Sequence, residues 1–368
     1  MERRDFMRLA GVAALAGAAA ACDRREEPAS TQEASKPATK LRWKLTTAWP
    51  PNFPIFHDGV TRFAREVEAM SGGRLHIDVY GGGELVPPLE TFNAVSQGTV
   101  QMGHAAAYYW AGKVPAAQFF TTVPFGMNAQ GVAAWLTSGG GLSLWEEIYK
   151  PFNLVPIPMG NTGVQMGGWF NKRIGRLEDL KGLRIRTPGL GGRVMASAGA
   201  NPVLLPGAEI YTALERSTID AAEWVGPYHD ERMGLYRAAK YYYYPGWQEP
   251  GPVLELLVNS EAWAKLPDDL RLIVRAAAAT VHNWIFAEFE AKNHEALQLL
   301  TTKYKVQIVP FPVEVLRALR SHAKAVLEDE AAKHADFKRV YEAYASFQSR
   351  HEAWSTLSEA AYMEALKS

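Results

Sequence analysis

The chain has one cysteine, Cys22, among its 368 residues. A single thiol cannot form an internal disulfide, so the folded part must be held together by packing alone. The chain also lacks an excess of either charge, since 39 basic residues face 39 acidic ones. This balance argues against nucleic acid as a partner. No stretch of eighteen apolar residues follows the N-terminal segment, so we expect no membrane-spanning helix in the body of the protein.

The first 22 residues resemble an export signal. The charged run Arg3-Arg4-Asp5-Phe6 precedes an apolar stretch, Leu9 to Ala21, which is too short to span a bilayer. The paired arginines are similar to those of a twin-arginine signal. Cys22 stands where bacterial lipoproteins carry their lipidated cysteine; an ordinary Ala-x-Ala cleavage site with an incidental cysteine is the alternative. We therefore expect a periplasmic protein that is anchored to the membrane through Cys22.

The rest of the chain divides into a tether and a folded body. Residues 23–40 contain no aromatic and no large aliphatic residue, which predicts a flexible tether. The body of about 330 residues is long enough for two domains. We expect one lobe from residues 41–160 with parts of 251–310, a second lobe from 161–250, and C-terminal helices from 311–368.

The body alternates between strand and helix patterns, which predicts an α/β fold with a mainly parallel sheet in each of two lobes. Residues 41–46 read as a half-exposed strand, and apolar residues recur at helical spacing over 56–70. The apolar run after Gly98 predicts a buried strand that extends to about Tyr109. Residues 152–171 predict two consecutive strands with a glycine-rich break at 160–163.

One helix–strand pattern occurs twice. Residues 90–101 and 209–220 both read Glu, any, aromatic, any, Ala, aliphatic, any, any, small, Thr, aliphatic, polar. Extending both copies by three residues places His104 opposite Glu223. The repeat predicts two lobes that face one cleft, although a chance match between two amphipathic helices would look the same. We expect His104 to be a satisfied polar group beside the site and not a ligand-binding residue.

Four segments can carry chemistry. Glu223 is a lone carboxylate in an otherwise apolar run, and a buried charge is costly unless a cation, a metal or a ligand pairs with it. Residues 161–170 put Asn161 and Gln165 in a glycine-rich strand pair. Arg186 stands where a strand enters a glycine-rich turn, and the stretch 241–249 ends in a second acid, Glu249.

In combination these segments resemble one known family. The runs Asn-Thr-Gly-Val-Gln (161–165), Glu-Trp-Val-Gly-Pro-Tyr (223–228) and Tyr-Tyr-Tyr-Tyr-Pro-Gly-Trp (241–247) are similar to those of the extracytoplasmic solute receptors of TRAP (tripartite ATP-independent periplasmic) transporters, in the branch that binds 2-oxo acids and lactate. The resemblance covers residues 41–368. It implies a two-lobed, periplasmic-binding-protein-like fold with long C-terminal helices, a small carboxylate ligand, and the membrane subunits of a transporter as partners.

The resemblance also implies roles for single residues. Arg186 matches the arginine that grips the ligand carboxylate, and a planar guanidinium suits this task because it can donate two parallel charge-assisted bonds. A metal cation, sodium or calcium, is expected to contact the ligand, because oxygen donors of this kind suit hard cations. The nine histidines show no spacing typical of zinc sites. The metal-binding positions match Gln165, Glu223, Trp224 and Glu249. The residues expected to line the ligand pocket are Arg186, Asn161, Tyr108, Tyr109, Gln165, Trp224 and Glu249.

The C-terminal helices carry many aromatic side chains for the end of a chain. They can pack on the protein's own body or on a second subunit, and both remain open from the residues alone. Related 2-oxo acid receptors form dimers through such helices, so we expect a homodimer whose C-terminal helices exchange or interlock. The aromatic residues are Tyr341, Tyr344, Phe347, Trp354 and Tyr362.

Capture of a ligand, and not catalysis, is therefore the expected function. The main alternative is an exported carbohydrate hydrolase that uses Glu223 and Glu249 as an acid and base pair, with some of the eleven tryptophans stacking on sugars. Against it, Arg186 nearby is expected to hold both acids ionised, and no nucleophile elbow or phosphate loop occurs. A receptor that passes its ligand to a sensor is a third possibility.

Overall fold

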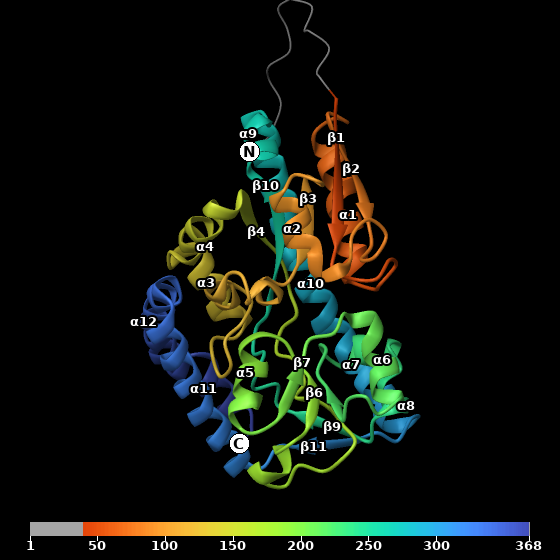
Figure 1. Ribbon diagram of the computed structural model, residues 1–368, viewed down its shortest axis with the longest axis vertical. Coiled ribbons are helices and arrows are strands. Elements are labelled where there is room, and N and C mark those ends of the chain that lie inside the picture. The colour runs from red at the N-terminus through yellow and green to blue at the C-terminus, as the bar shows by residue number, and fades with distance from the viewer. Residues whose placement is uncertain (1–39, 368) are drawn as a thin grey trace, which may run out of the picture. The chain divides into compact units, whose positions relative to one another are not determined.

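The computed structural model describes residues 40–367, and the expected export signal, Cys22 and the tether lie outside the described residues. The body forms one compact unit from Lys40 onward (Figure 1). Within residues 40–367 no helix is both long enough and apolar enough to cross a bilayer.

Two mixed sheets form the framework. The first has the strand order β2-β1-β3-β10-β4 and the second has the order β11-β9-β5-β8-β6-β7. The strands of the first sheet are β1 (Leu41–Thr47), β2 (Leu75–Tyr80), β3 (Met102–Ala105), β4 (Leu154–Asn161) and β10 (Val253–Asn259). Those of the second are β5 (Gly168–Phe170), β6 (Arg184–Arg186), β7 (Asn201–Val203), β8 (Ala221–Ala222), β9 (Tyr241–Tyr244) and β11 (Gln307–Pro310). We call the two sheets, each with its helices, the first and second lobes.

The prediction of mainly parallel sheets is confirmed, with one reversed strand in each. β10 runs antiparallel to both of its neighbours in the first sheet, and β5 does the same in the second. Each reversed strand is the one that the chain enters directly after leaving the other sheet through a loop. The predicted pair of strands in residues 152–171 is therefore split between the lobes, because the glycine-rich break at 160–163 begins the first crossing.

Helices cover both sheets and connect them. The longer ones are α1 (Phe56–Met70), α3 (Ala129–Ser138), α4 (Gly141–Tyr149), α5 (Gly189–Ser197), α6 (Gly207–Glu215), α10 (Asp268–Thr302), α11 (Val313–Lys333) and α12 (Ala335–Leu357). The shorter helices are α2 (Thr91–Ser96), α7 (Pro227–Arg232), α8 (Leu235–Ala238), α9 (Ser260–Lys265) and α13 (Glu359–Ala365). Five 3-10 turns complete the described chain: η1 (Pro88–Glu90), η2 (Ala107–Trp110), η3 (Pro115–Phe120), η4 (Lys150–Phe152) and η5 (Leu177–Leu180).

The first helix shows how the sequence sets these elements. The side chains of α1 that point to the core recur at helical spacing, as predicted. Gly72 and Gly73 then take positive φ, and the Gly73 N–H bonds to the Glu68 carbonyl. This left-handed turn ends the helix. Glycine is needed here because residues with a Cβ rarely adopt this conformation. The core residues of α1 are Phe56, Val60, Phe63, Ala64 and Val67.

The repeated pattern corresponds to two equivalent units. In one copy α2 leads into β3, and in the other α6 leads into β8. β3 lies between its parallel partner β1 and the reversed strand β10, just as β8 lies between its parallel partner β6 and the reversed strand β5. The repeat therefore builds the same position in both sheets.

One detail of the strand prediction needs correction. β3 ends at Ala105, and the expected strand to about Tyr109 is replaced by the turn η2. Side-chain partners explain the turn, because Thr121 accepts a bond from the Tyr108 backbone and Glu255 accepts one from the Trp110 indole. β11 lies within 251–310, of which only parts were expected in the first lobe, and it is the edge strand of the second sheet. The division at residues 160 and 250 stays a prediction.

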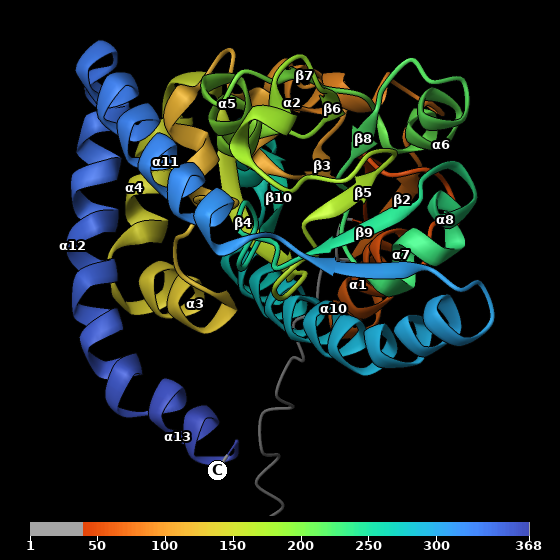
Figure 2. The same ribbon diagram turned by 90° about the horizontal axis from the view of Figure 1, so that it is seen from below.

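The C-terminal helices pack on both lobes. α11 lies against α5 of the second lobe, and α12 lies against η3, α3 and α4 of the first. Figures 1 and 2 show the two helices side by side along one side of the body. Phe337, Val340 and Tyr344 are buried by this packing, whereas Trp354 and Tyr362 are each 64% exposed.

Candidate functional site

Arg186 and Glu223 meet because two parallel strands end side by side. Arg186 closes β6, and Glu223 follows β8, its direct neighbour in the sheet. The Glu223 N–H donates to the Arg186 carbonyl at 3.0 Å. Both side chains are almost fully buried, at 1% and 2% exposure, and Nη1 of Arg186 lies 3.6 Å from Oε2 of Glu223. The site thus begins with a buried guanidinium beside a buried carboxyl group.

The guanidinium of Arg186 is held by backbone carbonyls. Nη1 donates to the Glu223 carbonyl at 2.8 Å, and Nε donates to the Leu205 carbonyl at 3.2 Å. Its remaining nitrogen, Nη2, is buried and has no hydrogen-bond partner in the described part of the chain. A buried donor without a partner is costly, so Nη2 is available to an anionic ligand.

Gln165 and Glu249 come from the two loops that join the lobes. The Gln165 N–H donates to the Glu249 carbonyl at 3.1 Å, which ties the loops together. A Cβ at Gly246 would lie 2.1 Å from the Gln165 carbonyl oxygen, so only glycine allows this close approach. The Gln165 amide group donates to Thr162 at 3.0 Å, which leaves Oε1 as a free acceptor. Two loops that are far apart in the sequence are therefore joined at the residues that carry an amide oxygen and a carboxylate.

Four buried acceptor oxygens lack a hydrogen-bond partner among residues 40–367. They are Oε1 of Gln165, both carboxylate oxygens of Glu223, and Oε2 of Glu249. Burial raises the pKa of Glu249 to about 8, and Arg186 and Tyr108 only partly offset this effect. Burial and then the neighbouring Glu249 raise the pKa of Glu223 well above its usual value, although Arg186 opposes them.

These oxygens fit a hard cation. A positive ion among them would satisfy the free acceptors and would favour the ionised carboxylates over the protonated ones. The set contains two carboxylates and one amide. It is therefore not a cluster of three or more His, Cys, Asp or Glu side chains, and within residues 40–367 no such cluster is placed to hold a metal ion. This composition suits sodium or calcium better than zinc.

The expectation that Arg186 holds both acids ionised is wrong for these two carboxylates. Both pKa values are raised, since the cost of burying the charges outweighs the attraction to a single arginine. Without a cation, the site therefore favours protonated carboxyl groups.

Tyr108, Tyr109 and Trp224 surround a narrow cavity beside these groups. Its volume is ≈ 10 Å³, about what one water molecule needs. Burial raises the pKa of both tyrosines, which keeps their hydroxyl groups as hydrogen-bond donors. The Arg186 guanidinium lies over the Trp224 ring, 5.2 Å from its centroid. The cavity is lined by Trp49, Phe56, Tyr108, Tyr109, Thr162, Gln165, Trp224, Val225, Pro252 and Leu254.

The segment that carries Glu223 and Trp224 is supported by Asp230 of α7. The Asp230 carboxylate accepts bonds from the Trp169 indole at 2.9 Å and from the Tyr242 hydroxyl at 2.7 Å. It also accepts a longer bond from the Val225 N–H at 3.4 Å. The position of the site on β8 is thus fixed by a buried network beneath it.

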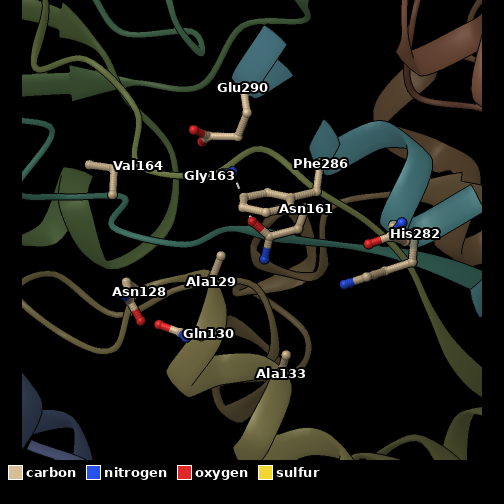
Figure 3. Close-up of a pocket in the computed structure, with 11 residues that line it drawn as sticks. Asn128, Ala129, Gln130, Ala133, Asn161, Gly163, Val164, His282, Phe286 and Glu290 are labelled. Carbon is tan, nitrogen blue, oxygen red and sulfur yellow. Dashed lines mark hydrogen bonds between the residues drawn. The ribbon is translucent and has the colours of Figure 1, made fainter. Parts of the chain in front are cut away.

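Asn161 is not brought to this cavity. Its Oδ1 accepts a bond from the Gly163 N–H at 2.8 Å, and its amide group donates to the Gly251 carbonyl at 3.2 Å. It lines a separate, wider pocket of ≈ 570 Å³ between α3 and α10, together with Phe286 and Glu290 (Figure 3). A ligand-binding role for Asn161 therefore stays a prediction.

Trp49 and Phe56 line the cavity, although the sequence analysis did not select them. Trp49 follows the end of β1, which pairs in parallel with β3. Side chains just beyond the carboxyl ends of parallel strands often line ligand sites, and this rule could have found Trp49. His104 is satisfied, as expected, because both of its ring nitrogens are hydrogen-bonded, one of them to Trp49.

Comparison with known proteins places the chain among solute receptors. The family described as bacterial extracellular solute-binding protein, family 7, matches residues 45–334. A monocarboxylate 2-oxoacid-binding periplasmic protein of Nostoc sp. PCC 7120 is 44% identical over 362 residues, which is 98% of either chain.

Two solved structures are also similar. A TRAP periplasmic solute-binding protein of Pseudoalteromonas atlantica with bound sodium and pyruvate has a TM-score of 0.87 and 44% identity, and the match covers 89% of this chain and 99% of that one. A TRAP solute-binding protein of Bordetella bronchiseptica, described as a mixed-occupancy dimer with copurified calcium and picolinate, has a TM-score of 0.87 and 36% identity, over 89% of this chain and 97% of that one.

Proposed function

The chain belongs to the bacterial extracellular solute-binding proteins of family 7, and from this premise we propose that it captures a small 2-oxo or 2-hydroxy monocarboxylate for a TRAP transporter. A pyruvate- or lactate-like acid fits the proposal best. Arg186 grips the carboxylate, and a bound sodium or calcium ion meets the second oxygen. The membrane subunits of the transporter are the proposed partners, and TRAP genes beside the receptor gene would distinguish this role from delivery to a sensor.

One observation carries the proposal. A buried donor, Nη2 of Arg186, and four buried acceptors on three residues all lack hydrogen-bond partners within residues 40–367, and they gather at one end of the second sheet. A ligand with a carboxylate, together with a cation, would satisfy both kinds of group. The Nostoc relative and the two similar structures support this assignment by what they bind.

The proposed mechanism rests on the chain's own groups. Gln165 Oε1, the carboxylates of Glu223 and Glu249, and the backbone carbonyl of Trp224 would hold the ion. A bound cation supplies a positive charge that two oxygens on neighbouring carbons can share. Arg186 orients the carboxylate through Nη2, and Tyr108 and Tyr109 offer hydroxyl donors at the wall of the cavity.

The hydrolase alternative is not favoured. Both acids are 2% exposed, and neither lines the wide pocket between α3 and α10. We therefore propose binding without catalysis.

Calorimetry in metal-stripped buffer tests the function. Pyruvate or lactate should bind tightly only after sodium or calcium is restored, and propionate should bind much more weakly because it lacks the second oxygen. Glu223→Gln and Glu249→Gln should each remove the dependence on the cation. Glu255→Gln is the matched control, since Glu255 is a buried acid of the first lobe that bonds to Trp110 and Tyr149. Full affinity without metal, in protein that contains none, would contradict the mechanism.

We propose a periplasmic, lipid-anchored location from the family and the sequence. Membership of an extracellular solute-binding family supports a periplasmic protein, and Cys22 supports a lipid anchor. The wild-type protein should fractionate with membranes, and Cys22→Ala should release it. A wild-type protein found wholly in the soluble periplasmic fraction would exclude the anchor.

A homodimer is the proposed assembly. The end of α12 and the helix α13 expose large apolar side chains, including Trp354 and Leu357 at 64% and 77%. The Bordetella structure, described as a dimer, is consistent with a second copy covering this surface. We propose that the C-terminal helices of the two copies exchange or interlock.

A further inference from the structure

Trp49 is an immobile part of the cavity wall. It is 1% exposed, and its carbonyl accepts bonds from the Gly82 N–H at 2.6 Å and from the Thr47 hydroxyl at 2.8 Å. Its ring packs against Phe56 with centroids 4.4 Å apart and meets Trp224 edge-on at 6.3 Å. Backbone and ring are both held, so the wall cannot retreat without breaking several contacts.

His104 fixes the orientation of the indole. Nε2 of His104 lies 2.8 Å from the Met159 carbonyl, which can only accept, so Nε2 carries the proton. Nδ1 must then be the acceptor, and the Trp49 indole N–H donates to it at 2.7 Å. The only polar atom of the Trp49 side chain is therefore already hydrogen-bonded, and the ring presents a purely apolar surface to the cavity.

The cavity has a polar side and an apolar side. Tyr108, Tyr109, Thr162 and Gln165 provide the polar groups of the lining, whereas Trp49, Phe56 and Leu254 are hydrocarbon walls. A bound acid that directs its oxygens to Arg186 and the cation must turn its carbon chain toward the apolar walls. Because these walls are held by several contacts, each added methylene must fit against a surface that does not easily move.

We propose that Trp49, oriented by His104, limits the length and branching of the acid that the receptor accepts. The inference rests on the proposed function and deepens it. Trp49 acts by contact with the ligand's carbon chain, and His104 is a positioning residue that acts through Trp49.

A selectivity series tests the role of Trp49. The affinity of pyruvate is measured against those of 2-oxobutyrate and 3-methyl-2-oxobutyrate, with the cation present. Wild-type protein should prefer pyruvate. Trp49→Ala should shift the ratio toward the branched acid by at least ~10-fold, as expected for methylenes accepted or rejected by an apolar pocket. Trp49→Phe should give a smaller shift in the same direction, and this variant also serves if the Ala variant does not fold.

Trp110→Phe is the matched control for Trp49→Phe. Trp110 is a buried tryptophan of the first lobe whose indole also donates to a side chain, Glu255, but it does not line the cavity. The ratio of affinities should not change in this variant.

A double-mutant cycle tests the role of His104. His104→Leu should relax the selectivity in the wild-type background, because the indole loses its acceptor. The same change in the Trp49→Phe background should leave the ratio unaltered, since no indole N–H remains to be held. Equal shifts in both backgrounds would overturn the positioning role.

The outcomes separate the two proposals. If the acids bind but Trp49→Ala and Trp49→Phe keep the wild-type ratio, the size limit lies elsewhere and the inference fails. If no acid of the series binds the wild-type protein, the proposed function itself fails.

Discussion

The charge of Arg186 is kept in the interior by its neighbours. Burial alone would lower the pKa of this guanidinium, yet nearby Tyr109, Glu223, Tyr108 and Glu249 together raise it above its usual value. Two backbone carbonyls fix the plane of the group, so the free Nη2 points to one place. Because the donor is already fixed, binding a carboxylate loses little additional side-chain entropy.

Arg186→Lys should weaken ligand binding by at least ~10-fold, which corresponds to about 1.4 kcal/mol. A lysine keeps the charge but cannot bond to two carbonyls and a ligand in one plane. Arg186→Ala should abolish measurable binding. Arg184→Lys is the control, because Arg184 lies on the same strand and pairs with Asp220 at the surface. Calorimetry with pyruvate measures all three variants, and unchanged affinity in Arg186→Lys would move the carboxylate elsewhere.

Single residues show what sequence could and could not predict about the site. Arg186, Glu223, Gln165 and Glu249 could be named because each stands in a distinctive run, and the structure brings them together. Trp49 stands in no such run, and only its place just beyond the carboxyl end of β1 could have indicated it. Its hydrogen bond to His104 depends on the pairing of β1 with β3. No spacing along the chain reveals such a contact.

At the scale of elements, the local patterns and the mainly parallel sheets were predicted correctly, but the sequence did not indicate which strand of each sheet is reversed. The helix α1 and the repeated helix–strand units followed from periodicity, because those signals lie within a few residues of one another. The reversal of β5 and β10 depends on which sheet the chain enters after a crossing, and this is a long-range property. The same holds for η2, whose turn is set by Thr121 and Glu255.

The end of α12 supplies the prediction for the dimer. Sedimentation at micromolar concentration should show a dimer, because exposed apolar patches of this kind commonly mark interfaces. Trp354→Glu combined with Leu357→Glu should yield a monomer that still binds its ligand. Lys338→Glu changes the charge of the same helix where it bears no such patch, and it should remain dimeric. A monomeric wild-type protein would contradict the assembly.

At the scale of the whole molecule, burial shifts several histidines and carboxyl groups toward their neutral forms. Burial lowers the pKa of His104 and His282 to about 4 and that of His229 to about 3. Burial also raises the pKa of Glu255 to about 8. These two kinds of group have opposite effects on stability, because acidification must charge the histidines whereas alkalinisation must charge the acid.

Glu255 allows one of these effects to be isolated. Its carboxyl group is fully buried and accepts hydrogen bonds from the Trp110 indole and the Tyr149 hydroxyl. Neither of these donors carries a charge. The folded pKa of about 8 lies above the ordinary glutamate value of 4.5. Between these values the unfolded chain is ionised, while the folded protein still binds the proton. The stability that this group contributes is complete below pH 4.5 and is lost as the pH rises through 8. The loss amounts to about 1.4 kcal/mol per pH unit in this window.

Glu255→Gln should therefore become more stable relative to the wild type as the pH rises from 5 to 8, by on the order of 4 kcal/mol, since the amide has the same shape and no charge to bury. Urea unfolding of both proteins at several pH values measures the difference, and comparing the two proteins cancels the contribution of the histidines. Glu295→Gln on the exposed face of α10 is the control and should give a profile parallel to that of the wild type. Parallel profiles for Glu255→Gln and the wild type would mean that Glu255 ionises in the folded protein as it does in the unfolded chain. The hydrogen bonds from Trp110 and Tyr149 would then be sufficient to stabilise the buried carboxylate.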